Sequence, residues 1–84
     1  MSNEFNYYVN NGIYTINAGQ NQKISSYILR DSGGRIVNMQ ASNNTTSEKI
    51  DLRNLARGVY FASIISTHGI KTIKLINWFV DFLR

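Results

Sequence analysis

The sequence contains no cysteine and no proline, and its one histidine is His68. Without cysteine the chain forms no disulfide, no thiolate metal site and no cysteine nucleophile. One histidine does not build a multi-histidine metal site, and no Gly-x-Ser-x-Gly or Asp-x-Asp spacing supports a hydrolase or a calcium site. We therefore expect no enzyme, no cofactor and no metal site.

Charge and long apolar runs are also scarce. Nine Lys and Arg against five Asp and Glu give a net charge of +4, but charged residues are 17% of the chain, below the about 25% of typical soluble domains. The basic residues are scattered singly, without the stripe that follows a phosphate backbone, so we expect no nucleic-acid partner.

No segment of the sequence predicts a membrane span or a signal peptide. The longest apolar stretch, residues 75–83, is interrupted by Asn77 and Asp81 and falls short of the about 18 residues that a span needs. Residues 1–4 are acidic and polar where a secretory signal would be basic. The chain is therefore expected to be intracellular or a fragment of a longer exported protein.

The composition favours strands and turns. Eleven Asn, eight Ser, five Thr and three Gln make 27 of the 84 residues, and eleven Ile supply branched apolar mass. Short apolar runs alternate with Gly or Asn turns about every 8–12 residues, as in all-β sandwiches. The sequence predicts one all-β domain over residues 1–76, a small seven-stranded immunoglobulin-like β-sandwich, with a short apolar C-terminal extension over 77–84. The expected strands are Phe5–Val9, Gly12–Asn17, Lys23–Arg30, Arg35–Ala41, Glu48–Leu52, Val59–Ser66 and Ile70–Ile76.

Turn chemistry and apolar patterning refine this prediction. Turns are expected at Asn10–Gly12, Asp31–Gly34 and Thr67–Gly69, and an exposed loop at Asn43–Thr46. The nearly continuous apolar run from Val59 predicts a central strand, and the strand from Ile70 alternates and is half exposed. The further core residues expected are Tyr27, Leu29, Val37, Met39, Ile50, Leu52, Leu55 and Tyr60.

The C-terminal run allows two interpretations. Ile76, Phe79, Val80 and Leu83 recur at helical spacing, and a strand extension is equally compatible. Trp78, Phe79 and Phe82 are expected to cap an open end of the sandwich or to form a partner surface.

Several short motifs follow one another in a recognisable order. They are Asp31-Ser32-Gly33-Gly34-Arg35-Ile36-Val37, Ile50-Asp51-Leu52, Leu55, Gly58-Val59-Tyr60-Phe61 and Lys74-Leu75-Ile76. Their order and spacing resemble the type A C-terminal sorting domain of type IX secretion cargo, over about residues 8 to 76. The resemblance implies a non-enzymatic sorting signal recognised by secretion-machinery proteins at the outer membrane, which deliver an upstream cargo protein from the periplasm to the cell surface.

The resemblance assigns partner recognition to six residues: Asp31, Gly34, Arg35, Gly58, Tyr60 and Lys74. Structural roles stay open beside recognition. Both glycines suit turns and strand entries, Tyr60 suits a core aromatic whose hydroxyl reaches the backbone, and Lys74 suits a solvated charge that discourages edge pairing.

Two other functions remain open at this stage. The chain could be a structural or adhesive module that binds a protein, a glycan or itself, with Tyr7, Tyr8, Tyr14 and Trp78 as candidates for sugar stacking. It could also be a relic of a longer cargo gene. Edge strands at Phe5–Val9 or Ile70–Ile76 would allow a homodimer.

Overall fold

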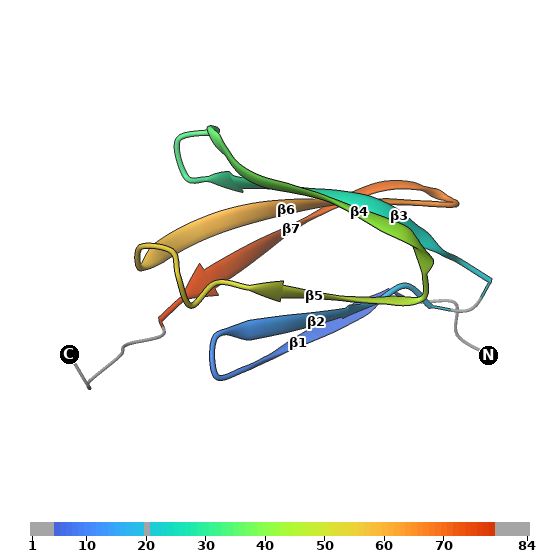
Figure 1. Ribbon diagram of the computed structural model, residues 1–84, viewed down its shortest axis with the longest axis horizontal. Coiled ribbons are helices and arrows are strands. Elements are labelled where there is room, and N and C mark those ends of the chain that lie inside the picture. The colour runs from blue at the N-terminus through green and yellow to red at the C-terminus, as the bar shows by residue number, and fades with distance from the viewer. Residues whose placement is uncertain (1–4, 20, 79–84) are drawn as a thin grey trace.

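A computed structural model of the protein describes residues 5–19 and 21–78, which form seven strands in two antiparallel sheets (Figure 1). The strands are β1 (Asn6–Asn10), β2 (Ile13–Asn17), β3 (Ile24–Asp31), β4 (Ile36–Thr45), β5 (Ser47–Asp51), β6 (Gly58–Ser66) and β7 (Gly69–Asn77). One sheet has the order β1-β2-β5 and the other β4-β3-β6-β7. The all-β prediction and each expected strand are confirmed, and the immunoglobulin-like designation stays a prediction.

The core lies between the two sheets and follows the period of two along each strand. Ile16 and Ile50 of the three-stranded sheet face Leu29, Ile64 and Leu75 of the four-stranded sheet, and each is at most 1% exposed. Fully burying a side chain of this size contributes about 1.5–3 kcal/mol, so these residues carry much of the folding free energy. The core prediction is confirmed for Tyr27, Leu29, Ile50, Leu52 and Tyr60, while Val37 and Leu55 are partly buried against the cluster.

The expectation of a buried Met39 is wrong, because this side chain is 62% exposed. Leu29 pairs with Asn38 but Arg30 pairs with Ile36, so Val37 is an extra residue in β4. This bulge shifts the alternation by one residue and turns Met39 to the outer face, opposite Ile28.

The loop expected at Asn43–Thr46 is also wrong, because β4 continues to Thr45. Asn43 (φ 53°) and Asn44 (φ 58°) have left-handed backbone inside the strand, a conformation that asparagine tolerates better than most residues. Between the pairs Ser26 to Ala41 and Ile24 to Thr45, three residues of β4 face one of β3. The asparagines therefore form a bulge that lets β4 bend toward β5 and the other sheet (Figure 1).

The other patterning predictions are confirmed. Asn11 (φ 52°) and Gly12 (φ 81°) make the two-residue turn between β1 and β2. The β6 strand is central, between β3 and β7. Along β7 the side chains of Ile73 and Leu75 are buried and that of Lys74 is exposed.

The strand-extension interpretation of the C-terminal run holds as far as Asn77, the last residue of β7. Phe79, Val80, Phe82 and Leu83 lie outside the described residues. In the part of the chain that the structure describes, no helix is long and apolar enough to cross a membrane.

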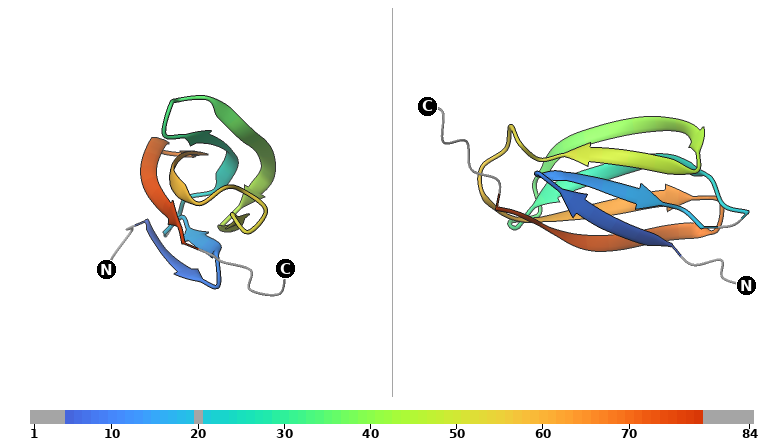
Figure 2. Two further views of the ribbon diagram at one scale, coloured as in Figure 1. Left: turned by 90° about the vertical axis from the view of Figure 1, so that its left-hand side faces the viewer. Right: turned by 90° about the horizontal axis from the view of Figure 1, so that it is seen from below.

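A buried tyrosine links the two sheets on the side where β1 and β7 lie (Figure 2). The Tyr14 hydroxyl of β2 donates to the Ile76 carbonyl at 3.2 Å and accepts from the Ile76 N–H at 3.0 Å. The Tyr14 hydroxyl thus satisfies backbone groups on the outer edge of β7 that no strand pairs. Near the other end of this side, the Lys71 ammonium lies 5.5 Å from the Phe5 ring centroid, a second contact between β7 and the N-terminal segment.

Tyr14→Phe is expected to lower the free energy of unfolding by about 1 kcal/mol, because the Ile76 N–H loses its partner. Urea denaturation measures the change. Tyr8→Phe is the matched control, since the Tyr8 side chain is on an exposed strand. Equal stability losses in the two variants would contradict a bridging role for Tyr14.

Candidate recognition site

The six residues expected to act in recognition lie at one end of the four-stranded sheet, on the left in Figure 1. Asp31 pairs with Tyr60, and Tyr60 pairs with Leu75, the neighbour of Lys74. Gly58 pairs with the last residue of β7, and the turn after Asp31 contains Gly34 and Arg35. The structure therefore brings together residues that are up to 43 positions apart in the sequence.

The carboxylate of Asp31 organises the turn between β3 and β4. Its Oδ1 accepts hydrogen bonds from the backbone N–H groups of Gly33 and Arg35, both at 3.0 Å. Gly34 has φ +92° and open space where a Cβ would stand, so its backbone conformation, rather than crowding, calls for glycine. The Arg35 N–H, with further help from the Gly33 N–H and the Arg35 guanidinium, lowers the pKa of Asp31 below its ordinary value.

Arg35 itself stays available at the surface. Its Nε lies 3.4 Å from Asp31 Oδ2, but its side chain is 82% exposed. An exposed ion pair of this kind contributes little to stability, because water and salt screen it. The guanidinium can therefore exchange this contact for a partner's carboxylate at small cost.

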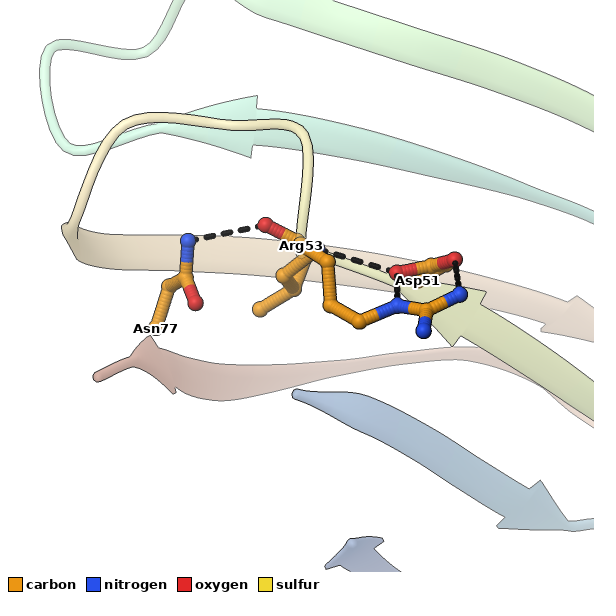
Figure 3. A network of polar contacts seen from close by, with 4 residues as sticks. Asp51, Arg53 and Asn77 are labelled. Carbon is orange, nitrogen blue, oxygen red and sulfur yellow. Dashed lines mark hydrogen bonds and ion pairs between the residues drawn. The ribbon is translucent and has the colours of Figure 1, made fainter. Parts of the chain in front are cut away.

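The buried side-chain amide of Asn77, at the end of β7, holds the loop between β5 and β6 (Figure 3). Asn77 is 1% exposed, and its Nδ2 donates to the carbonyls of Leu52 (2.8 Å), Leu55 (3.0 Å) and Ala56 (3.2 Å). The Tyr60 hydroxyl donates to the same Ala56 carbonyl at 2.6 Å. Side chains from two strands thus fix the loop that leads into Gly58.

Asn77 is a site residue that the sequence analysis missed, since it was assigned to the C-terminal extension. The available signal was an amide between Ile76 and Trp78 in an otherwise apolar run. Its hydrogen bonds run to carbonyls more than 20 residues earlier in the chain. The expectation that Tyr60 is a core aromatic whose hydroxyl reaches the backbone is confirmed, since the ring is buried and the hydroxyl bonds to the Ala56 carbonyl.

An ion pair fixes the start of the same loop (Figure 3). The Arg53 guanidinium donates to both carboxylate oxygens of Asp51, at 2.9 and 2.8 Å, and the Arg53 N–H donates to Oδ1 at 2.9 Å. The side-chain hydrogen bond from Arg53 is the main reason that the pKa of Asp51 is lowered. The loop therefore has defined contacts at both its start and its end.

A shallow pocket of about 420 Å³ opens between the β3–β4 turn and this loop. Asp31, Arg35, Arg57, Gly58 and Tyr60 all contribute to its lining. The Asp31 carboxylate in this lining already accepts hydrogen bonds from backbone N–H groups, whereas Arg57 has no ion-pair partner among the described residues. The pocket is therefore suited to an acidic group.

Lys74 lies close to this pocket but on the outer face of the sheet. Arg30 pairs with Phe61, and Phe61 pairs with Lys74, so the three side chains form a row across β3, β6 and β7. Phe61 is 37% exposed between the two cations. No carboxylate within residues 5–19 and 21–78 forms an ion pair with Lys74 or Arg30.

The aromatic residues considered for sugar stacking do not form one platform. Tyr14 is 7% exposed and bonded to Ile76, and it lines an apolar pocket of about 400 Å³ with Val9 and Trp78. Tyr8 pairs with Thr15 and therefore points to the opposite face of its sheet from Tyr14. Tyr14 is thus a structural residue.

His68 and the carboxylates that the structure describes do not gather into a metal-binding group. His68 lies in the β6–β7 turn, at the opposite end of the sheet from the pocket. Among the residues that the structure describes, no three His, Asp or Glu side chains cluster as a metal site would require.

The fold and the site together define a small β-sandwich domain with a basic end formed by two turns that are held by hydrogen bonds. Comparison with protein families identifies this domain: the model of the secretion system C-terminal sorting domain matches residues 9–77. The chain belongs to this family of type IX secretion sorting signals, which are not catalysts. A comparison with curated proteins finds no match.

Acid is expected to destabilise the fold through Asp31. Because its folded pKa lies below the ordinary value of 3.8, the ionised carboxylate stabilises the folded state above that value, and this contribution is lost as the pH falls through the folded pKa. Asp31→Asn keeps an acceptor oxygen and removes the titration. Unfolding free energies measured from about pH 6 to about pH 2 should therefore fall less steeply in Asp31→Asn than in the wild type, and parallel profiles would rule out this role.

Asn77→Ala is expected to lower the free energy of unfolding by about 1–3 kcal/mol, because three loop carbonyls lose a buried donor. Asn54→Ala is the control, an exposed asparagine in the same loop. Thermal and chemical unfolding give the two values. If both variants are as stable as the wild type, the amide does not hold the loop.

Proposed function

We propose that this domain is a folded sorting signal whose basic end is recognised by type IX secretion proteins at the outer membrane. The observation that carries the proposal is the gathering of the six motif residues at one end of the sandwich, within a chain that matches the sorting family over residues 9–77. The domain has no catalytic role of its own in this proposal. It is the substrate that the machinery reads.

The six residues divide into two roles. Asp31, Gly34, Gly58 and Tyr60 shape the end of the sandwich, because they act through backbone conformation or through hydrogen bonds to backbone groups. Arg35 and Lys74 present exposed cations. The partner surface should therefore be acidic and should meet both the pocket and the adjacent outer face.

The hydrogen bonds within the two turns support a folded domain as the signal. A flexible basic segment would lose conformational entropy on binding, whereas the Asp31 turn and the loop held by Asn77 are already ordered. The expected partners of the domain are the secretion proteins and the cargo protein to which such a domain is attached. The secretion proteins would carry this cargo from the periplasm to the cell surface.

A reporter exported to the periplasm and fused at its C-terminus to residues 1–84 tests the proposal in a host with a type IX system. Removing a cation whose hydrogen bond to a partner's carboxylate is enclosed by the interface costs about 1.5–3 kcal/mol, so Arg35→Ala or Lys74→Ala should lower surface delivery about tenfold. Lys23→Ala is the control, because Lys23 is exposed at the opposite end of the sandwich. Surface labelling and protease accessibility give the delivered fraction.

The same fusion ending at residue 78 separates the domain from the segment that follows it. Delivery by both fusions, lost in the two cation variants and kept in Lys23→Ala, supports recognition of the basic end. Retention of the wild-type reporter in the periplasm by both fusions would contradict the sorting proposal and favour a structural or adhesive module. Equal loss in all three variants would show that general charge, and not this site, matters.

A further inference from the structure

The sandwich has four edge strands, and three of them carry features that discourage pairing with another strand. β5 has charges of both signs at Glu48, Lys49 and Asp51. β7 has Lys71 and Lys74, and its edge at Ile76 is occupied by the Tyr14 hydroxyl. β4 is interrupted by two bulges.

β1 has none of these features. Its sequence, Asn-Tyr-Tyr-Val-Asn, is uncharged, and its register with β2 is unbroken over all five residues. All five residues are exposed, with Tyr7 at 43%, Tyr8 at 56% and Val9 at 50%. A regular, neutral and apolar edge of this kind is a template for strand addition.

The register shows which backbone groups of β1 are free to pair. The two-residue Asn11-Gly12 turn makes Asn10 and Ile13 a hydrogen-bonded pair. Because such pairs alternate in antiparallel sheets, Tyr8 also bonds to β2, while the N–H and C=O groups of Tyr7 and Val9 point away from it. None of the hydrogen bonds found outside the strand ladders in the described part of the chain uses these outward groups.

We propose that β1 is a self-association edge, at which the β1 strands of two copies pair antiparallel about a two-fold axis through Tyr8. Tyr7 of each copy then exchanges both backbone hydrogen bonds with Val9 of the other. The two Tyr8 residues face each other as a non-hydrogen-bonded pair, with Cα atoms about 4.5 Å apart, where side chains are closest. The result is one continuous six-stranded sheet from two three-stranded ones.

The side chains of β1 favour a second copy over other occupants. The two-fold places Tyr8 against Tyr8, Tyr7 against Val9 and Asn6 against Asn10, so each position meets an aromatic, apolar or amide neighbour. No charge on β1 selects for an oppositely charged partner. An isologous interface needs only this self-complementarity.

The net charge of each copy opposes association. Two chains of charge +4 repel each other, and salt screens that repulsion. Dimerisation through an uncharged strand should therefore strengthen with ionic strength, whereas binding of an acidic partner at the basic end should weaken. None of the six recognition residues lies on β1, so the self-association proposal and the sorting proposal can be tested independently of each other.

Sedimentation equilibrium of the 84-residue chain over a concentration series, at low and high salt, tests the proposal. The expected result is a reversible dimer that tightens with salt. Tyr8→Lys places like charges opposite each other at the two-fold and should weaken the dimer at least about tenfold. Met39→Lys adds the same charge at an equally exposed strand position outside β1 and should leave the dimer intact.

A charge-swap experiment separates a surface effect from unfolding. The Tyr8→Lys and Tyr8→Glu variants should each be monomeric and should dimerise when mixed, which unfolded variants would not do. In the wild type, the Tyr7 and Val9 amides should exchange hydrogen more slowly as concentration rises. A wild type that is monomeric at every concentration and salt, or a dimer unaffected by Tyr8→Lys, would overturn the proposal and leave the edge to a strand from another protein.

Discussion

The side-chain amide of Asn77 is the contact on which the basic end of the molecule depends. It reaches three carbonyls of the loop between β5 and β6 from the end of β7. These carbonyls lie where the chain passes from the three-stranded sheet to the four-stranded sheet, and no strand partner satisfies them there. The Leu52 and Ala56 carbonyls also accept from the Leu55 N–H and the Tyr60 hydroxyl, and Asn77 adds the donor to the Leu55 carbonyl. Because carbonyls shielded from water are costly without a donor, the amide completes the hydrogen bonding of this crossing.

This contact also determines how the site residues are arranged. The loop that Asn77 holds leads into Gly58 and Tyr60, and the Tyr60 hydroxyl bonds to one of the same carbonyls. Asp31 is the neighbour of Tyr60 across the sheet. The β3–β4 turn with Arg35 therefore lies beside the β5–β6 loop, and the pocket lies between them. The turn is held by Asp31, and the loop is held by Asn77.

The sequence predicts the strands well because turn chemistry and the period of two are local. Asn11-Gly12 and the alternation of Ile73, Lys74 and Leu75 define their elements without knowledge of the fold. Met39 shows the limit of this reasoning. The extra residue in β4 reverses which face each later side chain occupies, and a bulge is fixed by pairing with β3 rather than by the residues of β4 themselves.

The sequence pointed to six motif residues that lie near one another in the fold, and their recognition role stays a prediction, but it did not point to the contacts that support them. Six motif residues were identified from their order in the chain, whereas Asn77 was placed in the extension because its partners are distant in sequence. A run of asparagines was similarly ambiguous, since Asn43 and Asn44 give the same signal for a loop and for a bulge.

Surface delivery of a reporter fused to the Asn77→Ala domain tests most directly whether Asn77 supports the recognition site. The comparison is the same reporter fused to the Ile16→Val domain, because this core change costs about 0.5–1.5 kcal/mol and lies in the other sheet. Lost delivery in Asn77→Ala with delivery kept in Ile16→Val, both folded at the assay temperature, is the predicted result, and equal delivery by the two variants would contradict it.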